Sequence, residues 1–273
     1  MQVKHPVLKY YGSKFALAEW IINHFPAHRH YVEPFGGAAN VLLVKQPSRL
    51  ETYNDLNNAI VNFFRMLRCR PSELIEQIRL TPWARTEYEY CLEEKEDESS
   101  LEMARRLFYR LWMSFCGQYQ TEKGSWSRFN KGKKRMRPDY LIENLTAASE
   151  RLLHIQIENR DAFKLIAETD SPDTLFYLDP PYVFSTRTTS KAYSHELTNE
   201  KHREFAQLLY SLKGFVVLSG YPSAIYEELF EQKGWIRIDR KSRVSGGATK
   251  TECLWLNPKT AKEIGLLQET VIK

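Results

Sequence analysis

The alternation of short apolar strands, glycine turns and helices near the N-terminus limits most strongly what this chain can fold into. Residues 31–35 (YVEPF) predict a strand that ends at a Gly-Gly turn, and residues 38–44 predict the start of a helix. Residues 49–54 predict a second strand, and the apolar periodicity of residues 56–68 predicts a second helix. Two successive strand–turn–helix units indicate the opening of a doubly wound α/β sheet.

The strand pattern stops after the second helix and resumes later in the chain. From Pro71 to about Arg151 the sequence predicts charged amphipathic helices and one basic loop, with no convincing strand. The later elements are strands at 154–157, 174–178, 215–219, 235–239 and 253–256, with helices at 162–168 and 199–212. We therefore predict a Rossmann-like α/β sheet with a mainly helical domain inserted between its second and third strands. The predicted domains are a catalytic domain of residues 1–62 and 156–273 and an inserted domain of residues 63–155.

Composition and cysteine spacing exclude several classes of protein. The chain has 273 residues, of which 42% are hydrophobic and 27% are charged, as in ordinary globular proteins. Its apolar runs fall far short of the roughly 20 residues that span a bilayer, so we expect no membrane partner. The first residues lack a signal-type apolar stretch, which favours a cytoplasmic location. The four cysteines lie far apart without a CxxC pair, so we predict neither a metal site nor a disulfide framework.

A basic segment with interleaved aromatic residues lies within the predicted insertion. Residues 123–137 (KGSWSRFNKGKKRMR) contain seven basic residues and no acid, and we predict a loop or hairpin at 117–137. A run of charges is often only a solvated surface, and that interpretation stays open. Aromatic side chains within a basic, glycine-containing segment favour contact with a polyanion. The candidate contact residues are Lys123, Trp126, Arg128, Lys131, Lys133, Lys134, Arg135 and Arg137.

The Gly-Gly turn and an acid after the second strand form a candidate nucleoside site. The turn, Glu33 to Ala38 (EPFGGA), lies at the carboxyl end of a predicted parallel strand, where glycine lets the backbone approach a ligand. The alternative is an ordinary tight turn. Asp55 ends the next strand, where an acid can bond both ribose hydroxyls of a nucleoside cofactor. The alternative for Asp55 is an N-cap for the helix predicted from Leu56. The turn does not match GxGxxG, which disfavours a nicotinamide cofactor.

The tetrad Asp179-Pro180-Pro181-Tyr182 follows the apolar strand 175–178. Two prolines remove two backbone donors and fix the turn, so that carbonyl groups face outward beside a carboxylate and an aromatic ring. This set of groups suits a planar exocyclic amino group. Asp179 and the Pro180 carbonyl would each accept one N–H, and Tyr182 would stack on the ring. The alternative interpretation is a purely structural loop.

Taken together, these motifs resemble the amino-group DNA methyltransferases, specifically the Dam-like adenine-N6 enzymes of the D12 class and α-group. The resemblance covers nearly the whole chain in motif order: residues 10–14 (YYGSK), 33–38, 54–57 (NDLN), 160–163 (RDAF), 179–182 and 251–255 (TECLW). It implies S-adenosylmethionine as cofactor, and its catalytic residues correspond to Asp179, Pro180 and Tyr182. The residues that it implies for cofactor binding are Tyr10, Lys14, Glu33, Phe35, Gly36, Gly37, Ala38, Asp55, Asp161, Phe163 and Asp179.

The resemblance also implies a substrate and partners. The substrate is a flipped adenine in double-stranded DNA, read by the helical insertion. We expect a bacterial or phage origin and a monomer or weak dimer. A restriction-modification role with a cognate restriction endonuclease as partner, a prophage role and a housekeeping role all stay open. Two departures are that Ala39 replaces a frequent second loop glycine and that residues 117–136 do not resemble the Dam reader of GATC. The alternatives are a cytosine-N4 DNA or RNA methyltransferase and a catalytically silent DNA-binding relative.

Overall fold

The computed structural model describes residues 2–10, 12–93, 97–114, 126, 138–186, 197–243 and 249–267. The chain divides into two units. The first comprises Met1–Ala18, Gly37–Lys45 and Asn57–Asn159, and the second comprises Glu19–Gly36, Gln46–Leu56 and Arg160–Lys273. These two units are defined by packing. The catalytic and inserted domains predicted from the sequence are functional divisions, and they stay a prediction.

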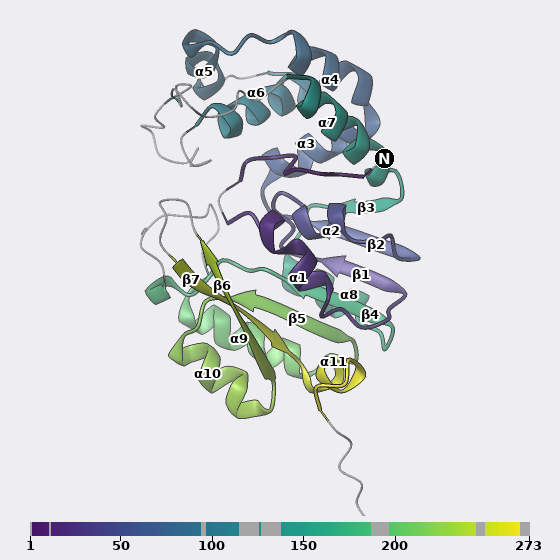
Figure 1. Ribbon diagram of the computed structural model, residues 1–273, viewed down its shortest axis with the longest axis vertical. Helices are drawn as coiled ribbons and strands as arrows, with labels where there is room; N and C mark the ends of the chain where they lie inside the picture. The colour runs from purple at the N-terminus through teal and green to yellow at the C-terminus, as the bar shows by residue number, and fades with distance from the viewer. Residues whose placement is uncertain are drawn as a thin grey trace, which may run out of the picture. The chain divides into compact units, whose positions relative to one another are not determined.

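The second unit is built on a mixed β-sheet (Figure 1), and the strands that belong to this unit stand in the order β2-β1-β4-β5-β7-β6. The strands are β1 (His30–Glu33), β2 (Leu50–Asn54), β4 (Thr174–Leu178), β5 (Phe215–Gly220), β6 (Ile236–Arg243) and β7 (Thr249–Leu256). The first four are parallel to one another, and β7 is antiparallel to both β5 and β6. β1 pairs with β2 on one side and with β4 on the other, so the strand order reverses at β1. Ligands of open α/β sheets bind beside such a reversal, at the carboxyl ends of the strands.

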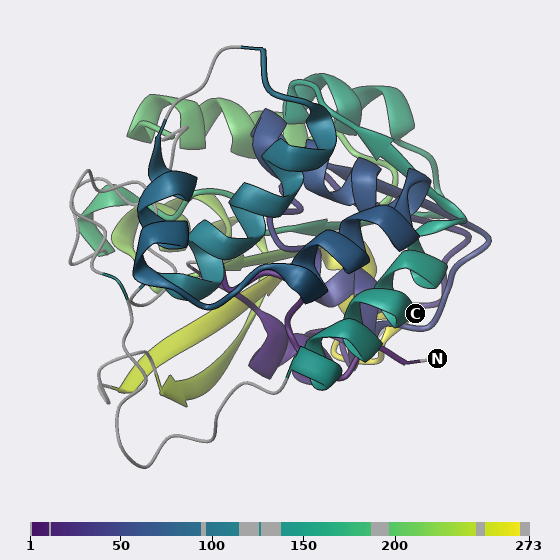
Figure 2. The same cartoon turned by 90° about the horizontal axis from the view of Figure 1, so that it is seen from above.

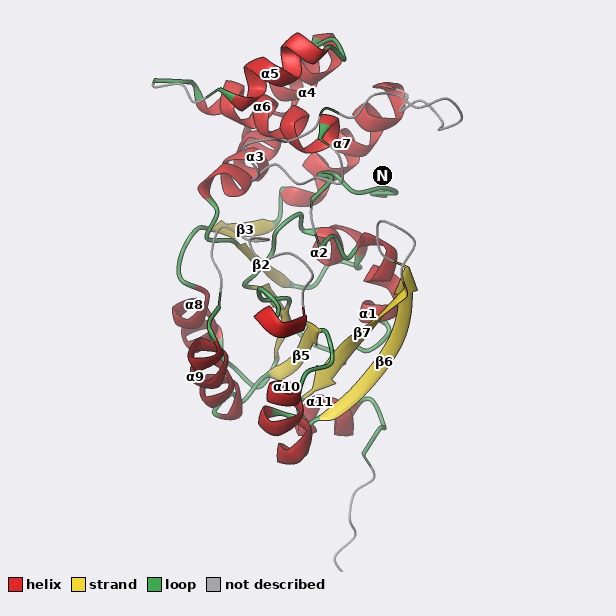
Figure 3. Cartoon of the chain, turned by 90° about the vertical axis from the view of Figure 1, so that its left-hand side faces the viewer, coloured by secondary structure: helices red, strands yellow, loops and turns green. Residues whose placement is uncertain are grey.

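The central strands are mostly apolar because both faces of the sheet are covered. Every residue of β4 and β5 is buried. Helices α8 (Ala162–Thr169), α9 (Asn199–Tyr210) and α10 (Ala224–Leu229) contribute to one core with these strands, and Figure 3 shows α8 and α9 side by side. Each of the three helices begins after a side-chain N-cap, which is Asp161, Thr198 and Ser223 in turn. The unit also contains the helix α11 (Pro258–Glu263) and the 3₁₀ turns Phe184–Thr186 and Glu231–Lys233.

Strands β6 and β7 are longer than the sequence predicts. They form an antiparallel hairpin (Figure 2), and their pairing extends from Ile236↔Leu256 to Arg243↔Thr249. The additional length is polar, with Arg240 and Lys241 on β6 exposed, so the apolar pattern did not reveal it. Charged side chains on an edge strand also oppose pairing with other chains.

The first unit is mainly helical, and it contains the stretch from Pro71 to about Arg151 for which the sequence predicts helices. Its long helices are α3 (Asn58–Cys69), α4 (Pro71–Leu80), α5 (Arg85–Leu92), α6 (Ser100–Met113) and α7 (Pro138–Leu152). It also holds the short helix α2 (Asn40–Val44), the strand β3 (Ile155–Glu158) and the 3₁₀ turn Phe15–Leu17, while α1 (Ala18–Ile22) begins in this unit and continues in the second. The buried Arg105 of α6 pairs with Glu87 of α5 and with Glu102, each at 2.6 Å, because a buried guanidinium needs carboxylate partners. Within the described ranges, no helix has the length and apolar character to cross a bilayer.

Candidate active site

Three predicted acids come together at one edge of the sheet in the second unit. Glu33 is the last residue of β1, Asp55 follows β2, and Asp179 follows β4. The parallel register places Glu33 beside Tyr53 of β2, so Asp55 lies near the carboxyl end of the neighbouring strand. β1 and β4 are also neighbours in parallel register. The site therefore lies where the strand order reverses, as expected for this class of sheet.

Glu33 is a buried carboxylate at this edge. It is only 2% exposed, and the Tyr31 hydroxyl donates a hydrogen bond of 2.7 Å to its Oε2. Burial raises the pKa of Tyr31, and the negative charge of Glu33 raises it further, so the phenol remains a protonated donor. A buried carboxylate gives this strand end a negative potential, which favours a positively charged ligand group.

The Gly-Gly turn packs closely against the neighbouring strand β2. The Gly36 N–H donates to the Asn54 carbonyl at 2.8 Å. A Cβ at Gly36 would lie 2.2 Å from Tyr53 Cε2, so no larger residue fits there without a shift. Glycine is therefore required at position 36 by the packing of the turn against β2, whether or not a ligand binds there. Further along, Ala39 has a φ of 53°, a left-handed conformation that glycine adopts more easily.

Asn54, part of the motif at residues 54–57, has a positioning role that the sequence pattern did not predict. Its buried side-chain amide donates to the Pro34 carbonyl at 2.8 Å and to the Arg160 carbonyl at 3.0 Å. Its Oδ1 accepts from the Arg160 N–H at 2.9 Å. One amide therefore ties the turn after β1 to the loop that precedes Asp161. A polar residue at the end of an apolar strand was the available signal in the sequence.

Asp55 is not the cap of the following helix. The N-cap is Asn57, whose side chain accepts from the Ala59 N–H at 3.0 Å, and α3 begins at Asn58 rather than at Leu56. The capping alternative for Asp55 was therefore wrong. Its contact with a ribose stays a prediction, which the position of Asp55 at the end of β2 supports.

Asp161 and Phe163 lie at the start of α8. The Asp161 carboxylate caps this helix by accepting from the Lys164 N–H at 2.9 Å. The Phe163 ring stacks on Phe205 of α9, with ring centroids 5.0 Å apart and an interplanar angle of 21°. Phe35 meets the same ring edge to face at 5.6 Å. Two residues predicted to bind the cofactor thus flank Phe205, a buried residue that only the folded structure could identify.

The tetrad after β4 places Tyr182 among polar groups from β5 and β7. Tyr182 is 4% exposed, and its hydroxyl lies 3.0 Å from Glu252 Oε2 and 3.3 Å from Ser219 Oγ. Its ring meets Tyr221 edge to face at 4.7 Å. Burial raises the pKa of Tyr182, and the negative charges of Asp179 and Glu252 raise it further, so its hydroxyl is a neutral donor. The stacking of a base on Tyr182 stays a prediction, as do the acceptor roles of Asp179 and Pro180.

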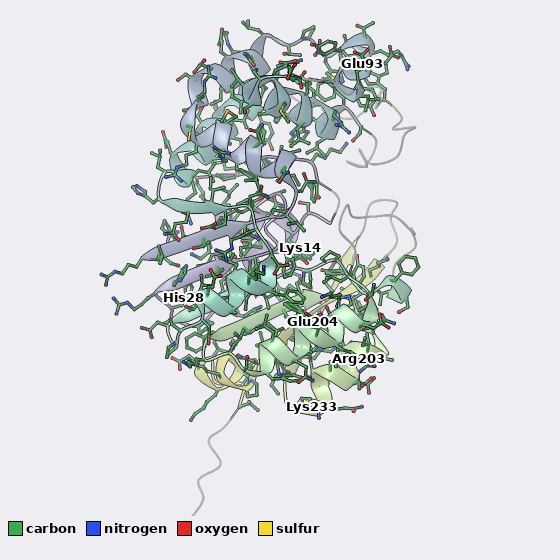
Figure 4. All side chains as sticks on the ribbon, turned by 180° about the vertical axis from the view of Figure 1, so that it is seen from behind. Lys14, His28, Glu93, Arg203, Glu204 and Lys233 are labelled. Atoms are coloured by element: carbon green, nitrogen blue, oxygen red, sulfur yellow. The ribbon has the colours of Figure 1, made fainter. Side chains whose placement is uncertain are left out.

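The remaining predicted cofactor residues, Tyr10, Lys14, Gly37 and Ala38, belong to the first unit. Lys14, labelled in Figure 4, is buried, and its Nζ donates to the Gly12 carbonyl at 3.0 Å. A Cβ at Gly37 would lie 3.5 Å from the Tyr10 ring, and Gly37 has a φ of 46°. The first-unit residues of the turn and of the YYGSK motif are therefore neighbours within that unit. Their contact with a cofactor stays a prediction.

Of the predicted DNA-binding residues, the structure describes Trp126 alone. Trp126 forms an isolated antiparallel bridge with Ser114, and the Arg85 guanidinium lies 4.6 Å from the centroid of its ring. The other seven lie outside the described residues: Lys123, Arg128, Lys131, Lys133, Lys134, Arg135 and Arg137. Their role in DNA binding stays a prediction.

The strand order with its antiparallel last pair, together with the acid-Pro-Pro-Tyr end of β4, defines the class of Rossmann-like methyltransferases. The chain belongs to the family of D12 class N6 adenine-specific DNA methyltransferases, whose pattern matches residues 10–244. The resemblance read from the motifs is thereby confirmed. The reaction that defines this family is the methylation of adenine at N6 in DNA.

Similar proteins carry names that agree with this family. The Type II methyltransferase M1.LlaDCHI of Lactococcus lactis subsp. cremoris is 29% identical over 265 residues, which cover 90% of this chain and 91% of that protein. A DNA adenine methylase of Vibrio cholerae serotype O1 is 28% identical over 203 residues, 71% of each chain. The DNA adenine methylase of Escherichia coli K12 is 22% identical over 264 residues, which cover 92% of this chain and 93% of that protein.

Proposed function

We propose that this protein is a site-specific methyltransferase that transfers a methyl group from S-adenosylmethionine to N6 of a flipped adenine in duplex DNA. The observation that carries the proposal is the Asp179–Tyr182 tetrad at the end of β4, beside the acidic ends of β1 and β2. Family membership fixes the base and the atom. The Type II name of one relative favours a role in restriction-modification, with a cognate endonuclease as partner.

The residues of the second unit fit a cationic nucleoside cofactor. Asp55 offers a carboxylate to ribose hydroxyls at a strand end. The partly buried rings of Phe35 and Phe163 offer apolar surface to a planar base. The buried Glu33 carboxylate supplies the negative potential that a sulfonium or ammonium group requires. Of the residues that the structure describes, no group of three or more His, Cys, Asp or Glu side chains could hold a metal ion.

S-adenosylmethionine, when bound, supplies a methyl group made electrophilic by its positively charged sulfur. The chain's own residues act on the other reactant. The adenine amino nitrogen is a poor nucleophile because its lone pair is delocalised into the ring. Asp179 and the Pro180 carbonyl accept hydrogen bonds from its two N–H groups and so favour a tetrahedral nitrogen with a localised lone pair. Tyr182 replaces the stacking that the flipped base loses, and fixed orientation supplies most of the acceleration.

Transfer of tritium from labelled cofactor to duplex DNA, RNA and protein tests this proposal. We expect label in duplex DNA and, after hydrolysis, in N6-methyladenine alone. Label in cytosine or RNA would support the alternative substrates. Cofactor-dependent DNA binding without label in any acceptor would support a silent relative.

The proposed ribose contact predicts that replacing Asp55 weakens cofactor binding and that replacing the nearby Asn57 does not. Asp55→Ala should weaken S-adenosylmethionine binding by roughly 1.5–3 kcal/mol, since hydroxyls bonded to a charged group are lost. Asn57→Ala should instead lower the free energy of unfolding by about 1 kcal/mol and leave cofactor affinity unchanged, because Asn57 caps α3. Calorimetry and thermal unfolding of both variants separate the effects, and equal cofactor affinity in Asp55→Ala and wild type would contradict the contact.

The basic segment is tested by the salt dependence of DNA binding. If Lys133 and Lys134 contact phosphates, each contact releases condensed counterion on binding. Replacing both with alanine should then flatten the slope of log affinity against log salt by about 2, on target and non-target DNA alike. Filter-binding titrations at several salt concentrations measure this slope. The wild-type slope in the double variant would place the DNA surface elsewhere.

A further inference from the structure

Glu252 of β7 is a buried acid in the second unit to which no role in the reaction has been given. It is 6% exposed and directly precedes the fully buried residues 253–256. Burying a carboxylate is costly unless it is hydrogen-bonded, and an apolar residue packs at such a position at less cost. A buried carboxylate at this position is therefore expected to have a specific hydrogen-bonding role.

The hydrogen bonds of the Tyr182 hydroxyl indicate that reason. An ionised carboxylate can only accept, so the single phenolic hydrogen of Tyr182 is donated to Glu252 Oε2 at 3.0 Å. The Ser219 hydroxyl, 3.3 Å away, then acts as donor to the phenolic oxygen. The hydroxyl is thus held from two sides, by β5 through Ser219 and by β7 through Glu252.

Ser219 and Glu252 both lie in paired strands of the sheet. Ser219 pairs with Leu254, and Glu252 pairs with Arg240 across the β6–β7 ladder. Tyr182 itself lies in the loop after β4. Its side chain is attached to this loop through Cβ, and the hydroxyl at the far end of the ring is held by the two hydrogen bonds. Holding the hydroxyl restricts rotation of the ring about the Cα–Cβ bond, and the edge-to-face contact with Tyr221 restricts its rotation about the Cβ–Cγ bond. Bonds from a rigid scaffold of this kind keep a reacting group in its productive orientation.

We propose that Glu252 is a positioning residue, which accepts the Tyr182 hydrogen bond and thereby holds the ring of the tetrad in the orientation needed for methyl transfer. The inference rests on the proposed function. It assigns Glu252 no contact with cofactor or base. Its effect on the reaction passes through the Tyr182 hydroxyl, with Ser219 as the second support.

A double-mutant cycle between Glu252 and Tyr182 tests this coupling. Glu252→Ala should lower kcat for DNA methylation about 10- to 50-fold, and Tyr182→Phe should lower it by a similar factor. If both act through one hydrogen bond, adding Glu252→Ala to Tyr182→Phe should cost less than about 3-fold more. Glu252→Gln keeps an acceptor oxygen and should stay within about 3-fold of wild type. The calorimetric affinity for S-adenosylmethionine should be the same in all these variants.

A matched control separates positioning from general stability. Glu51 of β2 is also a buried carboxylate, near the amino end of its strand, where it accepts from the Ser48 N–H. Glu51→Ala, the match for Glu252→Ala, should leave kcat unchanged, and all assays are run well below the melting temperature of the least stable variant. Multiplicative losses in the double variant, or a Glu252→Gln variant as slow as Glu252→Ala, would overturn the inference. A wild-type protein that methylates no DNA would instead contradict the proposed function on which the inference rests.

Discussion

Asp179→Ala is expected to lose methyl transfer by at least about 100-fold while its affinity for S-adenosylmethionine stays within several-fold of wild type. In the proposed mechanism the carboxylate accepts a hydrogen bond from the adenine amino group that matters chiefly as the nitrogen approaches tetrahedral geometry, so its loss raises the barrier more than it weakens binding. Single-turnover methylation of duplex DNA and calorimetric cofactor titration measure the two quantities separately.

The control for this variant lies at the other end of the same strand. Asp173 immediately precedes β4 and is exposed, whereas Asp179 directly follows β4. Asp173→Ala should therefore methylate at the wild-type rate. Near-normal turnover of Asp179→Ala would remove the tetrad from the reaction and with it the mechanism proposed above.

Gly36→Ala is expected to give a large loss of stability. Its Cβ would lie 2.2 Å from Tyr53 Cε2 and 3.0 Å from the Asn54 carbonyl oxygen, and the Tyr53 ring is fully buried. Overpacking of this kind should lower the free energy of unfolding by about 3 kcal/mol. In a chain of this size that lowers the melting temperature by roughly 6–12 °C. Because the turn carries Phe35, cofactor affinity should fall as well.

Gly234→Ala supplies the comparison for Gly36→Ala. Gly234 has a φ of 83°, and no atom lies within 4 Å of the position that a Cβ would take, so an alanine there meets backbone strain and no crowding. We expect a loss of about 1 kcal/mol and unchanged cofactor affinity. Differential scanning calorimetry of both variants decides the matter, and equal melting temperatures would show that the turn after β1 can move away from Tyr53.

The sequence predicted those parts of the fold that depend on local apolar pattern. The run TLFYL predicted strand β4 with its observed bounds, because a strand covered on both faces is almost continuously apolar. Helix α3 was predicted two residues early, since Leu56 extends the apolar periodicity although it precedes the cap, Asn57. The polar halves of β6 and β7 carried no apolar signal and were missed.

The site residues were predictable where one sequence motif contains both the residue and the strand that positions it. Asp55 and Asp179 each follow a recognisable strand, so their place at the sheet edge could be inferred. Asn54, Phe205 and Glu252 could not be found in this way. Their partners lie far along the chain, as Glu252 does from Tyr182, and only the strand order brings them together.

The central claim is tested most directly by single-molecule sequencing of DNA from a methylation-free bacterial host that expresses this chain. The measurement reports the modified base and its sequence context together. The account predicts N6-methyladenine at one defined sequence in cells with the wild-type protein, and its absence in cells with Asp179→Ala. Unmodified adenine in the wild-type sample, or modification confined to cytosine, would contradict it.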